Sequence, residues 1–274
     1  MRKFAIGAVV SGALALAVPA ASATTPDFTF SKVVVNGGKP IVVGTTNVVN
    51  VPVTYTLTRP SDIVLDNETK AAGIALYRGS LSRIANELGN DKKPTCTTTA
   101  TTATTLTESC TETIALDPYG SLYEAADATT WHAAGYYGRI ASDEDDSDGH
   151  VSVNYADDMW GPLASVQIKR AAKLTVNAGP EPVTKGKTLT VTGGLTRANW
   201  YSSEYAGYTG QPVALQFKAK GASAYTTVKT VTSGTSGALK TTVKASADGT
   251  YRFSFAGTST TGAKAATGDY VDVK

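Results

Sequence analysis

The stretch of this sequence that most clearly suggests chemistry is acidic and lies between residues 142 and 158. It carries seven carboxylates in seventeen positions. Calcium prefers six to eight hard oxygen ligands, and closely spaced carboxylates supply them. Calcium is therefore the one cofactor that the residues suggest, and none is indicated with certainty. The candidate ligands are Glu144, Asp146, Asp148, Asp157 and Asp158.

The spacing Glu144-x-Asp146-x-Asp148-Gly149 is similar to the start of an EF-hand loop. However, the first ligand position of that loop is normally Asp, and the twelfth, here Tyr155, is normally a bidentate Glu. Residues 150–155 alternate like a strand, so the second helix of an EF-hand is missing as well. Two interpretations stay open: a calcium loop of another kind, closed by the last two aspartates, or an acidic, solvated turn between two strands.

Motifs of catalysis are absent from the sequence. It contains no H-E-x-x-H, no G-x-S-x-G and no P-loop. Its two histidines are His132 and His150, and no particular serine is placed to work with either of them. We therefore expect that the protein is not an enzyme.

Residues 198–212 gather aromatic side chains in an irregular stretch between two predicted strands. Such residues can stack on a sugar ring or on a partner protein, because they combine an apolar face with a polar edge. The alternative is that the stretch folds back and uses them as a small core that caps the domain. The candidate ligand-contact residues are Trp200, Tyr201, Tyr205 and Tyr208.

Residues 1–23 predict a secretory signal peptide. Arg2 and Lys3 precede an apolar run from Phe4 to Val18, and Ala21-Ser22-Ala23 is a cleavage site of the A-x-A type. We expect a soluble, exported mature chain from Thr24 without a transmembrane segment. Because export means an oxidising environment, the two cysteines, Cys96 and Cys110, predict a structural disulfide across a Thr-rich hairpin.

Charge is divided unequally along the chain. Residues 24–172 hold 11 basic and 18 acidic residues, a net charge of −7, whereas residues 173–274 hold 12 and 5, a net charge of +7. The mature chain is therefore neutral, which together with export disfavours binding to nucleic acid. Two halves of opposite net charge predict either that the halves attract each other or that each has a different partner. The basic half suits anionic cell-envelope polymers.

Alternation of apolar and polar residues predicts an all-β protein. Seven short strands are expected between residues 173 and 274, separated by Gly, Ser and Asp, which is the pattern of an immunoglobulin-like sandwich. A similar set is expected before residue 171, and residues 80–89 suggest a short helical turn in an insertion. Asp127 and Trp131 match Asp248 and Tyr251, where a tyrosine corner is expected, so the halves resemble diverged copies.

The segments 170–200, 205–233, 237–261 and 268–274 resemble secreted actinobacterial proteins with tandem bacterial Ig-like domains. The resemblance is specific over 165–274 and weaker over 27–164. It implies export and tandem β-sandwiches, and it transfers no catalytic residue. Some relatives are labelled calcium-binding by similarity, without a mapped site.

The sequence thus predicts two Ig-like β-sandwich domains in tandem after the signal peptide, an acidic one over 24–171 and a basic one over 172–274. The join has no Gly, Ser or Pro linker, so a stiff tandem is expected. We expect a secreted, non-enzymatic interaction or structural module that is extracellular or associated with the cell envelope. Its expected partners are anionic envelope polymers or other extracellular proteins. The alternative is a secreted calcium-binding protein that uses residues 143–158.

Overall fold

The computed structural model of the 274-residue chain describes residues 26–90, 92–145 and 151–274, and the side chains of these residues except 140–157. The predicted signal peptide, residues 1–23, lies outside the described part. Nearly all regular structure is β-strand, which confirms the predicted all-β class. None of the helices in the described residues is long and apolar enough to cross a membrane.

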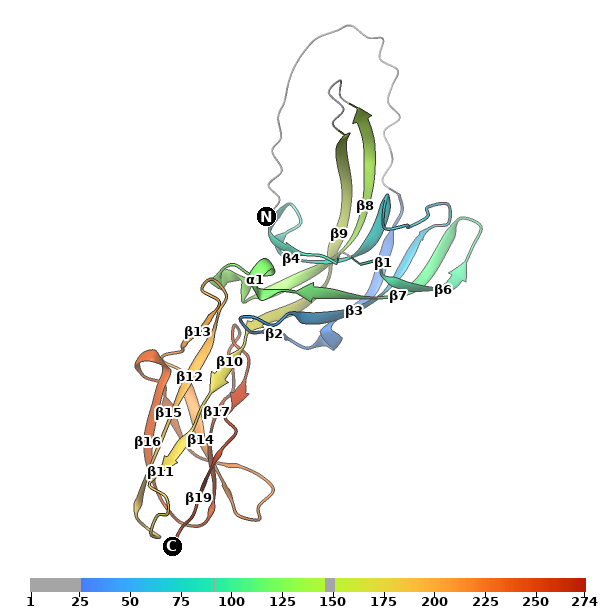
Figure 1. Cartoon of the computed structure of the whole chain (residues 1–274). Helices are drawn as coiled ribbons and strands as arrows, with labels where there is room; N and C mark the ends of the chain where they lie inside the picture. The colour runs from blue at the N-terminus through green and yellow to red at the C-terminus, as the bar shows by residue number, and fades with distance from the viewer. Residues whose placement is uncertain (1–25, 91, 146–150) are drawn as a thin grey trace, which may run out of the picture.

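The strands before residue 171 form two sheets that pack face to face (Figure 1). One sheet has the order β1-β3-β7-β6 and the other β2-β9-β8-β4-β5. The strand bounds are β1 (Thr29–Val35), β2 (Ile41–Val43), β3 (Val49–Pro60), β4 (Lys70–Ser80), β5 (Arg83–Leu88), β6 (Thr95–Thr101), β7 (Thr105–Leu116), β8 (Thr130–Asp145) and β9 (Val151–Arg170). The short helical segments are η1 (Asn36–Gly38), α1 (Pro118–Ser121) and η2 (Ala125–Asp127).

This strand order is that of an immunoglobulin-like sandwich. With β1, β3, β7 and β6 as strands A, B, E and D, the second sheet becomes A′, G, F, C and C′. Strand β2 runs parallel to β9, whereas the other pairs of the two sheets are antiparallel. Hereafter β1–β9 are called the N-terminal sandwich.

The remaining strands repeat the plan and are called the C-terminal sandwich. Strand β12 pairs with β10, β11, β13 and β16 in one sheet, and the other has the order β15-β14-β17-β18, with β19 also beside β17. The bounds are β10 (Ala172–Leu174), β11 (Asn177–Gly179), β12 (Thr188–Asn199), β13 (Glu204–Gly207), β14 (Pro212–Ala219), β15 (Thr226–Thr232), η3 (Thr235–Gly237), β16 (Ala238–Lys244), β17 (Gly249–Phe255), β18 (Lys264–Ala265) and β19 (Asp269–Val271).

Each sandwich has its own hydrophobic core, filled by the inward residues of alternating strands. In β3 these residues are Val51, Val53, Tyr55 and Leu57, and every second residue between them points outward. Fully burying one such aliphatic side chain contributes about 1.5–3 kcal/mol, so a shift of register by one residue would be costly.

A corner at the start of β8 fixes how the chain enters the second sheet. The indole N–H of Trp131 donates to the main-chain oxygen of Asp127 at 2.8 Å, and both residues are fully buried. Immunoglobulin domains use a tyrosine hydroxyl in this way at the start of strand F, two residues before the second cysteine of their inter-sheet disulfide. Here Ala133 stands at that cysteine position. The predicted Asp–Trp element is therefore present, and this position carries no inter-sheet disulfide.

Residues 80–89 correct one prediction. They were expected to form a helical turn, but Arg83–Leu88 is strand β5, an edge strand paired with β4. The reason is tertiary, because Leu88 is buried in the core and the ladder to β4 satisfies the backbone.

The two sandwiches lie end to end in Figure 1, and strand β9 leads almost directly into β10. Only Ala171 lies between them. The turn between β17 and β18 also reaches the end of β9, where Arg170 N–H donates to Thr260 and the Gly262 N–H donates to the Arg170 oxygen. These main-chain contacts join the sandwiches beyond the single connecting residue. The predicted domain boundary at 171–172 stays a prediction.

Candidate functional site

The acidic stretch belongs to a long hairpin made by β8 and β9, which projects from the N-terminal sandwich in Figure 1. Strand β8 continues to Asp145 and β9 begins at Val151, so the predicted strand after the acidic residues is confirmed. Asp146 and Asp148 lie outside the described residues, and the side chains of Glu144 and Asp157 do too. A calcium site at the end of the hairpin therefore stays a prediction.

The backbone ladder separates two groups of the candidate ligands. Glu144 pairs with Ser152, whereas Asp157 pairs with Gly138, six residues further down β8. At about 3.3 Å per residue, this places the two positions roughly 20 Å apart along the hairpin. Asp158, the next residue of β9, forms an ion pair with Arg139 at 2.8 Å. The structure does not bring the last two aspartates toward the end of the hairpin.

No group of three or more His, Cys, Asp or Glu side chains placed to hold a metal occurs within the described ranges. His132 is half-buried on β8, and its Nδ1 lies 3.0 Å from the Ser165 hydroxyl. Its ring packs against Tyr77 at a centroid distance of 5.6 Å. This is an ordinary surface environment for a histidine.

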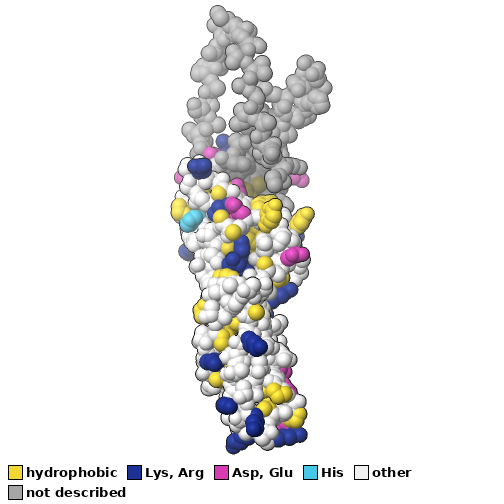
Figure 2. Space-filling view, turned by 90° about the vertical axis from the view of Figure 1, so that its left-hand side faces the viewer, with side chains coloured by type: hydrophobic (Ala, Val, Ile, Leu, Met, Phe, Trp, Pro, Cys, Tyr) yellow, Lys and Arg dark blue, Asp and Glu magenta, His cyan; other side chains and the backbone are white. Residues whose placement is uncertain are grey.

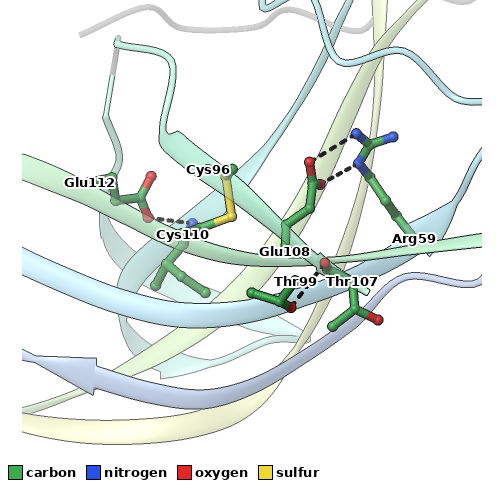
Figure 3. The surroundings of a disulfide bond; sticks show 8 residues. Arg59, Cys96, Thr99, Thr107, Glu108, Cys110 and Glu112 are labelled. Carbon is green, nitrogen blue, oxygen red and sulfur yellow. Dashed lines mark hydrogen bonds and ion pairs between the residues drawn. A yellow bond between two sulfur atoms is a disulfide. The ribbon is translucent and has the colours of Figure 1, made fainter. Parts of the chain in front are cut away.

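The disulfide joins Cys96 of β6 to Cys110 of β7, as predicted (Figure 3). The two residues face each other across the hairpin, with their Cα atoms 4.1 Å apart. The bridge therefore lies within one sheet and closes the hairpin.

Two buried carboxylates lie beside this bridge, at inward positions of β7 that sequence reasoning missed (Figure 3). Glu108 is held in a two-pronged ion pair by Arg59, with distances of 2.7 and 3.2 Å. Glu112 is 7% exposed and accepts a 2.7 Å hydrogen bond from the Ile74 N–H. Because burial outweighs that bond and another from Asn90, it raises the pKa of Glu112 to about 7. Glu108 and Glu112 alternate with Cys110 and Ile114 in the sequence, and this alternation could have indicated that both carboxylates point inward.

The aromatic stretch mainly builds the joint between the sandwiches. Trp200 is 3% exposed, packs with the core of the N-terminal sandwich, and donates its indole N–H to the Gly44 oxygen at 3.0 Å. Tyr205 also packs against that core, beneath the ammonium group of Lys173, which lies 3.8 Å from its ring centroid. Trp200 and Tyr205 are thus packed, as one of the two interpretations predicted, but they pack against the N-terminal sandwich and not against their own.

The other two aromatic candidates differ in exposure. Tyr208 packs edge-on against Phe255 of the C-terminal core, and the guanidinium of Arg197 lies 4.1 Å from its ring centroid. Tyr201 is 88% exposed. Of the four predicted ligand-contact aromatics, Tyr201 is thus the one whose side chain is largely free to meet a ligand.

The C-terminal sandwich is rich in lysine, and the space-filling view shows Lys and Arg side chains as separate dark-blue groups on its surface (Figure 2). Between β15 and β16 a shallow groove of about 350 Å³ is lined by Lys229 and Lys244. Its other lining residues are apolar or neutral, among them the half-exposed Val228, and no carboxylate is present among them. The groove is therefore an electropositive surface.

No family model and no curated protein matches this chain. Among solved structures, it is similar to the full ectodomain (Ig1–Ig3) of mouse nectin-like molecule 4, with 13% sequence identity and a TM-score of 0.22. The match covers 90% of this chain and 64% of that ectodomain. The immunoglobulin-like assignment made above rests on the strand order of the sheets.

Proposed function

We propose that this chain is an exported, non-enzymatic module that attaches to anionic polymer of the cell envelope through its C-terminal sandwich. The groove between β15 and β16 supports this most directly, because two lysines line it and no carboxylate is among its lining residues. Elsewhere on the same sandwich Lys185, Lys187 and Lys240 are exposed as well, whereas the exposed Lys220 pairs with Asp248 at 3.4 Å. Such a field attracts a polyanion and fades as salt is added.

Export supports the same role. The predicted signal peptide and the disulfide fit an oxidising extracellular location. N-terminal sequencing of protein from culture medium should begin at Thr24. Protein that retains Met1 in a membrane fraction would contradict a soluble, exported module.

Binding is best tested with the full mature chain on an immobilised poly(glycerol phosphate) polymer. Retention should be strong at about 50 mM salt and lost at about 500 mM, where the screening length falls below about 5 Å. The double variant Lys229→Gln with Lys244→Gln should bind about tenfold more weakly. Its matched control is Lys39→Gln with Lys70→Gln, which removes two exposed lysines from the N-terminal sandwich. Equal weakening by both pairs would show that the groove has no special part in attachment.

A further inference from the structure

Two arginines of the joint converge on one cavity. Arg170 ends β9 and Arg197 lies in β12, and both line a cavity of about 390 Å³ between the sandwiches. Tyr123 and the exposed Tyr201 line it too, one from each sandwich. The cavity is therefore assembled from both halves of the chain.

Arg170 has no ion-pair partner among the described residues, and the nearby carboxylate of Asp127 is paired with Arg78. Its side chain lies over the Trp200 ring, with 5.4 Å between the guanidinium carbon and the ring centroid, and the residue is 8% exposed. Its Nε is buried and has no hydrogen-bond partner within the described part of the chain. A buried guanidinium without a carboxylate is costly, and such groups are normally paired.

Arg197 adds a second positive charge at the same place. It is stacked on Tyr208, and no described carboxylate forms an ion pair with it or with Arg170. Burial, and after it the positive charge of Arg197, lower the pKa of Arg170, as expected for a buried cation with a second cation nearby.

Glu124 is the one carboxylate among the residues that line the cavity. It is engaged elsewhere, because its carboxylate pairs with Arg78 at 2.5 Å, and Arg78 also holds the buried Asp127. Arg78, Asp127 and Glu124 together carry a net charge of −1, so with Arg170 and Arg197 the region of the cavity keeps a net charge of +1.

We propose that the cavity between the two sandwiches binds a small oxyanion, a carboxylate or a phosphate group, between Arg170 and Arg197. The planar guanidinium group suits both, because its N–H donors match pairs of anionic oxygens. An anion there would place a negative charge beside two positive ones. The site is distinct from the lysine groove and does not depend on it.

The test uses the full mature chain with inorganic phosphate and, separately, acetate, each against sodium chloride of the same ionic strength. Calorimetric titration should detect binding of at least one of them, and the Arg197→Gln variant should weaken it about tenfold or more. Arg252→Gln is the matched control, because Arg252 is likewise stacked on a tyrosine, Tyr225, at 3.7 Å in the same sandwich. That variant removes the same charge away from the cavity and should leave binding unchanged.

Melting curves of both variants establish that each is folded before the titrations are compared. Binding of phosphate alone assigns a phosphate-bearing ligand, and binding of acetate alone assigns a carboxylate. Three results would overturn the site: no binding of either anion by the wild-type chain at about 10 mM, undiminished binding by Arg197→Gln, or equal weakening by Arg252→Gln. The test on immobilised poly(glycerol phosphate) can fail while this one succeeds, because the two tests concern different residues: the lysine variants leave Arg170 and Arg197 in place.

Discussion

Trp200 of the C-terminal sandwich donates its indole N–H to the main-chain oxygen of Gly44 in the N-terminal sandwich, at 3.0 Å. These residues are 156 positions apart in the chain. The bond and the burial of the ring fix one sandwich against the other, together with the turn that contacts the end of β9. The joint is therefore built by packing as well as by a short connection.

Replacing Trp200 should loosen this joint. Trp200→Ala removes a buried ring and should lower the free energy of unfolding by about 3–5 kcal/mol, whereas Trp200→Phe loses the hydrogen bond and should cost about 1 kcal/mol. Urea unfolding measures both, and small-angle scattering should show a wider range of particle dimensions for the alanine variant. Tyr201→Ala is the control and should stay within about 0.5 kcal/mol of wild type. Similar losses for Ala at 200 and at 201 would contradict the assigned role.

Asp127 should be among the most sensitive carboxylates of the described chain. It is fully buried, and it accepts hydrogen bonds from the main-chain N–H groups of Tyr123 and Glu124 and from Arg78. Asp127→Ala leaves these donors unpaired at the corner that holds Trp131, so we expect a loss of about 3–5 kcal/mol.

The comparison for Asp127 is Asp117→Ala. Asp117 caps the short helix α1 by accepting a hydrogen bond from the Tyr119 N–H at 3.0 Å. Replacing it by alanine should lower the free energy of unfolding by about 1 kcal/mol. Both variants are measured by urea unfolding at pH 7. A smaller loss at position 127 than at 117 would show that the corner is not held by the buried carboxylate.

Much of the fold could be predicted from sequence because strands have a period of two. The inward residues of β3, from Val51 to Leu57, alternate without interruption, so the strand and its buried face are both legible. Strand β5 was missed, since Ile84 and Leu88 are also compatible with a helical turn and only pairing with β4 decides between them.

The joint was beyond sequence reasoning for a different reason. Alternation identifies which face of a strand is buried, but it does not say which distant segment covers it. One of the two interpretations of Trp200 was that its side chain is packed rather than exposed to a ligand. Nothing in the sequence, however, marks Gly44 as the residue that accepts its hydrogen bond. Glu112 had a signal, because it occupies an inward position between Cys110 and Ile114, and that alternation was not used.

The disulfide should make a measurable contribution to the N-terminal sandwich. Cys96 and Cys110 are 14 positions apart, and closing a loop of this size is worth about 3 kcal/mol in the chain-entropy model. Native protein should show no thiol that reacts with an alkylating agent until it is reduced. The Cys96→Ser, Cys110→Ser variant and reduced wild type should unfold at the same, lower urea concentration. A variant as stable as the oxidised protein would show that the bridge adds nothing to stability.

Glu112 should make the N-terminal sandwich less stable as the pH rises. Its pKa is raised by burial from 4.5 to about 7, so between these values the folded chain keeps a proton that the unfolded chain releases. The resulting contribution is fully present below about pH 4.5 and is lost as the pH rises through 7, with a total of about 3 kcal/mol.

Glu112→Gln tests this dependence, because the amide is neutral at every pH and its oxygen can still accept the hydrogen bond from the Ile74 N–H. Urea unfolding at pH 5 and pH 8 should show a variant that equals wild type at pH 5 within about 1 kcal/mol and exceeds it at pH 8 by about 2–3 kcal/mol. The difference between variant and wild type isolates Glu112 from other titrating groups. Glu68→Gln, at an exposed carboxylate, should give a curve parallel to that of wild type. If Glu112→Gln also runs parallel, Glu112 is already ionised in the folded chain at pH 5.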